Sequence, residues 1–201
     1  MNRLIERQQT HIVVNDTEYP IKSDFRNAII TWRALEAANN KELSPLAASF
    51  VALDVMLGIE ADDLDIKTIE QTLKEISEYL HKYSRISDKD KKDNKPPLLD
   101  LMQDGQLIYD GFQKMGIDLD MQEVSYPRFM SLLRELPAEC SLCRIIYLRQ
   151  LVRDGKINKK EYKAEKEECN RIGWDIIKIK NNKKEEEHSE EYNNFIKKFK
   201  C

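Results

Sequence analysis

The chain has 201 residues, of which 41% are hydrophobic and 34% charged, and its formal net charge is −3 at pH 7. This balance suits one globular domain with or without a helical appendage, and the acidic total disfavours affinity for nucleic acid, which needs concentrated positive charge. No apolar run reaches the roughly 20 residues of a membrane span. The four unevenly spaced cysteines indicate reduced thiols in a cytoplasm.

We expect the folded part of the chain to begin with a small β-hairpin. Two runs rich in β-branched residues, 11–14 and 18–21, flank the turn-prone tripeptide 15–17. Three helices follow, with apolar residues recurring at three- and four-residue spacing: about 24–38, 44–57 and 65–83. Leu46 and Ile66 belong to the apolar stripes of the second and third helices, so we expect both to face the core.

The centre of the chain, residues 100–151, has the densest apolar periodicity and divides into three short helices. The first ends at Gly116, because glycine tolerates the left-handed conformation common at helix ends. The second begins near Ser125, a natural N-cap, and stops before Pro137. The third covers about 138–151.

Two charged segments flank this centre. Residues 84–97 are rich in Lys and Asp and end in two prolines, which is typical of a surface linker. Residues 153–201 hold 14 Lys and Arg against 11 Asp and Glu, a net charge of +3 in a chain whose total is −3. We predict a helical domain at 1–152, with the N-terminal hairpin and the linker, and a charged helical appendage at 153–201.

The predicted fold class is therefore mainly α. We expect a bundle of about six to seven short helices, a small N-terminal β-hairpin and a charged C-terminal helical tail.

A pair of cysteines, Cys140-x-x-Cys143, has the spacing of a metal or redox motif. Structural zinc needs four nitrogen or sulfur ligands, and the chain has no second pair of this kind. Cys143 also has buried positions on either side in the helical pattern. The interpretation we favour is two small side chains in or near the core, with metal or redox use as the alternative.

Carboxylates also recur at short spacing, but they do not complete a catalytic or cation site. Asp118, Asp120 and Glu123 have no nucleophile or base beside them in the sequence, and exposed charges between anchored apolar groups explain them more simply. Residues 88–93 resemble part of a calcium loop but lack its glycine and its acidic twelfth ligand. Phosphate-binding, hydrolase and zinc-protease motifs are missing. We predict no catalytic residue, no metal site and no cofactor, and hence a protein that is not an enzyme.

The centre carries a series of spaced motifs: Leu107-Ile108-Tyr109-x-x-Phe112, Gly116-Ile117-Asp118-Leu119, Phe129-x-x-Leu132-Leu133-x-x-Leu136-Pro137 and Ile145-Ile146-x-x-Arg149. A shorter one near the start reads Tyr19-x-Ile21-x-x-Asp24-Phe25-Arg26. Together they resemble the gene-product-fifteen family of tailed phages. One departure is that the family usually has two tryptophans before the Phe129 position, where this chain has Tyr126-Pro127.

This resemblance implies a non-enzymatic tail assembly chaperone of a phage or prophage, encoded next to the tape-measure protein. Its partners would be the tape-measure protein and other tail components. A homo-oligomer is compatible with this role, and the composition already disfavours membrane and nucleic acid as partners. It would act in the cytoplasm of the bacterial host and be absent from the mature virion. The motif-matched candidates for partner binding are Tyr109, Phe112, Ile117, Asp118, Tyr126, Phe129 and Arg149.

The residues leave alternatives open. Tyr109, Phe112 and Tyr126 suit core positions as well as partner contacts. Arg149 suits either the last carbonyls of its helix, where a positive charge is favourable, or an acidic partner helix. The alternative function is a nucleic-acid-binding or regulatory helical module that uses the Lys-rich tail.

Overall fold

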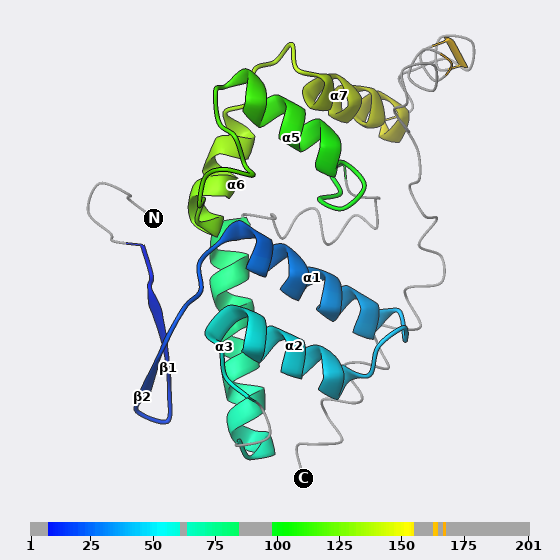
Figure 1. Ribbon diagram of the computed structural model, residues 1–201. Helices are drawn as coiled ribbons and strands as arrows, with labels where there is room; N and C mark the ends of the chain where they lie inside the picture. Colours follow the sequence, from blue (N-terminus) through cyan, green and yellow to red (C-terminus); the bar gives the residue numbers. More distant parts are fainter. Residues whose placement is uncertain (1–7, 61–63, 85–97, 155–162, 165–166, 168–201) are drawn as a thin grey trace. The chain divides into compact units, whose positions relative to one another are not determined.

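The structure is a computed structural model that describes residues 8–60, 64–84 and 98–154, and farther on 163, 164 and 167 (Figure 1). The described part contains six helices and one two-stranded antiparallel hairpin, which confirms the mainly α fold class. Nearly all of the predicted linker at 84–97 and of the predicted appendage at 153–201 lies outside the described residues. No helix in the described ranges is long and apolar enough to cross a membrane.

The described residues fall into two compact units, each of which we treat by itself. The described parts of 1–86 and 123–131 form the first unit, and those of 87–122 and 132–183 form the second. The single domain expected at 1–152 stays a prediction, because two compact units can belong to one domain.

The first unit begins with the hairpin of β1 (His11–Val14) and β2 (Thr17–Pro20), in which His11 pairs with Pro20. Asn15 and Asp16 have φ angles of 50° and 62°, as a two-residue turn of type I′ requires, so the turn is one residue shorter than expected. Along β1 buried and exposed residues alternate, and the strand packs against α3 (Ile66–Ser84). Packing on this helix stabilises the hairpin, because an isolated hairpin is only marginally stable in water.

Local capping explains where the helices of the first unit begin. In α1 (Phe25–Asn39) the Asp24 side chain accepts a hydrogen bond from the Arg26 N–H at 2.8 Å. In α2 (Pro45–Leu57) Ser44 accepts one from the Ala47 N–H at 3.1 Å, as expected for Ser-Pro. Asp65 caps α3 through the Thr68 N–H, and this bond lowers the pKa of the Asp65 carboxyl.

The core of the first unit uses small residues where α1 and α2 meet. Ala28, Ala48 and Ala52 are fully or almost fully buried, and α1 packs extensively on α2. Two expectations about the core were wrong: Leu46 is 54% exposed and Ile66 is 62% exposed. Both lie in the first turn of their helices, where the stripe continues but no neighbouring helix of the described chain covers it.

The second unit is built on α5 (Gly105–Lys114) and α7 (Ser141–Arg153), which pack against each other. The remaining helix, α6 (Tyr126–Arg134), has its first residues in the first unit and its last residues in the second. The α5 helix starts about five residues later than expected, because residues 101–104 form turns instead.

The end of α5 follows the sequence prediction. Gly116 has a φ of 75°, and the Ile117 N–H donates to the Phe112 carbonyl at 3.0 Å while the Gly116 N–H donates to that of Gln113 at 2.9 Å. These two bonds form a Schellman motif, which satisfies carbonyls that the helix leaves without partners.

Replacing Gly116 by Ala should therefore lower the free energy of unfolding by about 1 kcal/mol, because a side chain disfavours the left-handed conformation. Gly105 provides the matched control, since it lies at the other end of α5 and has an ordinary φ and open space around its Cα. Gly105→Ala should leave stability unchanged or raise it. Urea unfolding followed by circular dichroism measures both; equal losses would contradict the assignment of the helix end.

Candidate functional site

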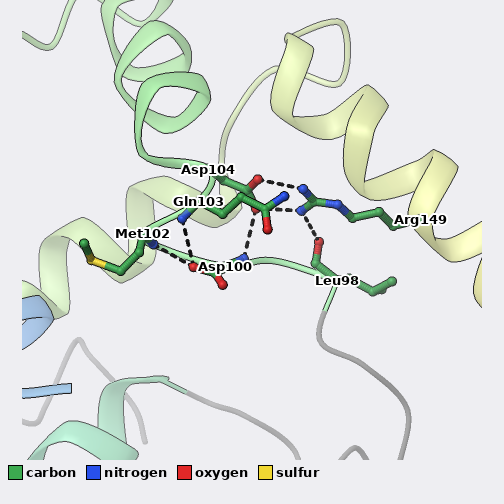
Figure 2. A network of polar contacts seen from close by, with 6 residues as sticks. All are labelled: Leu98, Asp100, Met102, Gln103, Asp104 and Arg149. Atoms are coloured by element: carbon green, nitrogen blue, oxygen red, sulfur yellow. Dashed lines mark hydrogen bonds and ion pairs between the residues drawn. The ribbon is translucent and has the colours of Figure 1, made fainter. Parts of the chain in front are cut away.

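A buried ion pair joins two segments of the second unit that are far apart in the sequence. The Arg149 guanidinium, on α7, donates to both carboxylate oxygens of Asp104, through Nη1 at 2.6 Å and through Nη2 at 2.8 Å (Figure 2). The two side chains are 3% and 1% exposed. This two-pronged geometry is the strongest form of an arginine–carboxylate contact.

The turns before α5 place Asp104 for this contact. The Asp100 carboxylate accepts hydrogen bonds from the backbone N–H groups of Met102 at 2.8 Å and Gln103 at 2.9 Å, which tightens the turn. The Asp104 carboxylate in return accepts the Asp100 N–H at 2.9 Å (Figure 2). The two aspartates thus hold the turn together and leave Asp104 directed at α7.

Arg149 also contacts the backbone in the same network. Its Nη1 also donates to the Leu98 carbonyl at 3.0 Å. Neither sequence interpretation of Arg149 included these contacts: the guanidinium binds a carboxylate and a carbonyl of its own unit. A role in binding an acidic partner helix stays a prediction.

Tyr126 and Phe129 lie in the core of the first unit, each 1% exposed. The ring of Phe129 stacks on that of Phe25, with centroids 4.4 Å apart and an interplanar angle of 6°. The Tyr126 hydroxyl donates to the Leu80 carbonyl and accepts the Trp32 indole N–H, both at 3.4 Å. The aromatic residue that stands before Phe129 is thus a core residue in this structure.

Phe112 is fully buried in the second unit. One residue earlier, Gly111 lets Leu136 approach α5 so closely that a Cβ at position 111 would meet its Cδ2 at 3.0 Å. Three other motif-matched residues are only partly buried: Tyr109, Ile117 and Asp118. The motif-matched candidates therefore divide into interior residues and residues that remain partly accessible.

Tyr109 and Asp118 meet at the surface of the second unit. The Tyr109 hydroxyl lies 3.5 Å from Asp118 Oδ1 and accepts the Gln113 side-chain N–H at 3.0 Å. Asp118 Oδ1 also accepts the Asp120 N–H at 2.9 Å. The Gln113 contact favours the phenolate, but desolvation and the carboxylates of Asp118 and Asp120 outweigh it, so the pKa of Tyr109 is raised.

The cysteine pair lies at the start of α7. Cys140 is buried and accepts the Cys143 N–H on its sulfur at 3.4 Å, so it acts as a cap of the helix. Burial, assisted by the neighbouring Cys140, raises the pKa of the Cys143 thiol to about 11. At neutral pH Cys143 is therefore a thiol, whereas redox and metal chemistry use the thiolate. In the parts of the chain that the structure describes, no three Cys, His, Asp or Glu side chains gather as metal ligands.

Sequence reasoning missed Asp104, the residue that pairs with Arg149. A signal was present, because each charged residue interrupts an apolar pattern: Arg149 lies four residues after Ile145, and Asp104 lies three residues before Leu107. An acidic and a basic residue that both occupy inward-facing positions are candidates for a buried ion pair. Periodicity alone does not say that the two positions meet.

The comparisons with known proteins identify a family for the chain. A family model described as "Bacteriophage Gp15 protein" matches residues 7–173. Neither the curated proteins nor the solved structures contain a match to the chain. The matched range includes both units of the described chain and all the motifs on which the resemblance was based.

The raised pKa predicts that Cys143 reacts slowly with iodoacetamide in the native protein near neutral pH and faster as the pH approaches about 11. In urea the same thiol should react at the rate of an ordinary cysteine. Peptide mass spectrometry separates Cys143 from the other cysteines. By linkage, the shift contributes stability at neutral pH that is lost as the pH rises through the raised pKa. Equal rates in the native and unfolded protein would contradict the assignment.

The ion pair predicts a large cost when one partner is removed. Arg149→Met leaves a buried carboxylate without its guanidinium, so the free energy of unfolding should fall by about 3–5 kcal/mol in urea titrations. Adding Asp104→Asn to this variant removes the second charge and should recover part of the loss.

The exposed pair of Lys74 and Glu78 is the control, since the two side chains are 72% and 61% exposed. Lys74→Met should change the free energy of unfolding by only about 0.5 kcal/mol. If Arg149→Met costs as little as Lys74→Met, the buried pair does not hold the second unit together.

Proposed function

The chain belongs to the bacteriophage Gp15 protein family, and from this premise we propose that it is a tail assembly chaperone that binds the tape-measure protein while the phage tail is built. The family match over residues 7–173 is the observation that carries the proposal. In this proposal the protein has no enzymatic activity and no cofactor, acts in the cytoplasm of the host and is absent from the finished virion.

The physical task of such a chaperone is to cover apolar surface on a long helical client. A tape-measure protein with apolar stripes along its helices aggregates if these stripes stay bare. A protein that keeps it in solution needs accessible apolar side chains on a charged body. Charged residues make up 34% of this chain, so it provides the charged body.

Several large apolar side chains are accessible to a client. Those at least 46% exposed in the described residues are Val13, Ile30, Leu46, Ile66, Met102, Met121 and Tyr147. The partly buried motif residues Ile117 and Asp118 belong to the loop that contains Met121, and Tyr109 contacts Asp118 from α5. In this proposal the client contacts these accessible residues, whereas Phe112, Tyr126, Phe129 and Arg149 act through the fold that they hold.

Co-expression with the tape-measure protein of the same genome tests the proposal. We expect affinity capture of the chain to recover a soluble complex, identified by mass spectrometry. Replacing Tyr109 and Asp118 together by Ser should reduce recovery several-fold, since both are accessible parts of the motif. Lys74→Ser, at an exposed position of the first unit, should leave recovery unchanged.

If the client stays insoluble and does not co-purify, the chaperone proposal is wrong. Binding to nucleic acid across a salt series then tests the alternative function, because phosphate binding weakens steeply as the salt concentration rises.

A further inference from the structure

Met121 is the most accessible of the exposed large apolar side chains in the described residues. It is 82% exposed, although methionine is among the residues most often buried, and it lies in the loop that leads from α5 to α6 (Figure 1). The loop is held on its unit by Leu119, which is only 5% exposed. The Asp118 carbonyl accepts the Gln122 N–H at 3.1 Å, and the Asp118 carboxylate accepts the Asp120 N–H at 2.9 Å. The exposure of Met121 therefore belongs to a well-defined local structure.

The loop around Met121 carries negative charge only. We use the name acidic loop for residues 116–122, which contain Asp118 and Asp120 and no basic residue. The Tyr109 hydroxyl lies 3.5 Å from Asp118 Oδ1, so a tyrosine of α5 borders the same carboxylates. In the part of the chain that the structure describes, neither carboxylate forms an ion pair with a basic side chain. The acidic loop thus presents an exposed apolar side chain beside two carboxylates.

The same chain contains a segment of the opposite character. Residues 176–184, which lie outside the described residues, read IIKIKNNKK and hold four lysines, three isoleucines and no carboxylate. Acidic residues bound this stretch on both sides, at Asp175 and Glu185. We use the name basic segment for residues 176–184. Its lysines complement the carboxylates of the acidic loop and its isoleucines complement Met121, so each property of the loop has a counterpart in the chain.

The acidic loop lies within reach of the basic segment of its own chain. Residues 154–175 connect α7 to the basic segment, and α7 packs on α5, which the acidic loop follows. A helix of 10 residues such as α5 is about 15 Å long. The connecting residues span about 30 Å at the rise of a helix and up to about 70 Å when fully extended. The contact therefore needs no second molecule.

We propose that the basic segment binds the acidic loop of the same chain and covers Met121. An exposed ion pair contributes little by itself, so the lysines alone would not hold the segment there. Apolar contact between Met121 and the isoleucines supplies the additional stabilisation, since the methionine side chain adapts to neighbours of different shapes. The contact does not depend on the proposed function. Where the chain also binds a client, the basic segment competes with that client for Tyr109, Asp118 and Met121.

Zero-length cross-linking of the full chain tests the proposal. A carbodiimide joins a lysine amine to a carboxylate, with loss of one water molecule, when the two groups are in contact. The monomer band of a denaturing gel is digested and analysed by mass spectrometry. It should contain a link from Asp118 or Asp120 to a lysine of the basic segment. The yield of this link should fall several-fold at high salt, because salt screens exposed charges.

Matched variants separate the apolar contact from the charge. Met121→Ser keeps both carboxylates of the acidic loop, and the yield of the link should fall several-fold because the apolar contact is lost. Met102→Ser is the control, since Met102 is 49% exposed in the same unit, and its yield should equal that of the wild type. Ile177→Ser combined with Ile179→Ser should lower the yield as Met121→Ser does. Circular dichroism confirms that each variant is folded.

The other results overturn the proposal. Absence of the link, or equal yields from Met121→Ser and Met102→Ser, shows that the basic segment does not cover Met121. A link found only in the dimer band assigns the acidic loop to a second copy of the chain. Equal linkage to Lys156, Lys159 and Lys160 shows attraction by charge alone. Capture of the tape-measure protein is a separate measurement, so failure of this contact and failure of the proposed function are distinguishable.

Discussion

The second unit depends on the ion pair between Asp104 and Arg149. It connects segments 45 residues apart in the sequence and lies almost wholly out of contact with water. Burying two charges is costly, and their mutual attraction recovers that cost only when the geometry is good and the remaining hydrogen-bonding groups are satisfied. Here both conditions hold, because the guanidinium binds both oxygens of the carboxylate and a backbone carbonyl as well. The pair fixes the turns at 101–104 to α7, and α5 begins where these turns end.

The first unit is organised by different means. Its helices are delimited by local caps at Asp24, Ser44 and Asp65, and its interior is filled by alanines between α1 and α2 and by an aromatic cluster around Tyr126. The stacked pair of Phe25 and Phe129 joins the start of α1 to the start of α6. Dispersion and ring packing therefore stabilise the first unit, whereas a buried charge pair specifies the second.

Much of the fold follows from local signals in the sequence. The left-handed glycine at 116 was predicted, because a helix end depends on a few neighbouring residues. The caps at Asp24 and Ser44 and the proline at the start of α2 are local in the same way. The start of α5 was misplaced because Asp100 and Asp104 accept backbone N–H groups and stabilise turns that compete with the helix. Leu46 and Ile66 were misassigned because periodicity identifies a stripe but not where its covering neighbour ends. At the candidate site, the motif positions could be found, but their burial and the pairing of Arg149 with Asp104 depend on contacts between distant segments.

The hairpin of the first unit has a consequence for the protein at high concentration. β2 pairs with β1 on one side, and along the described chain no strand pairs with its other edge. An open edge of this kind is a template on which another chain adds a strand and begins to aggregate. Pro20 closes that route at the end of β2, because it has no N–H to offer an incoming strand, and the strand is only four residues long. The β2 edge of the hairpin therefore offers another chain little on which to add a strand.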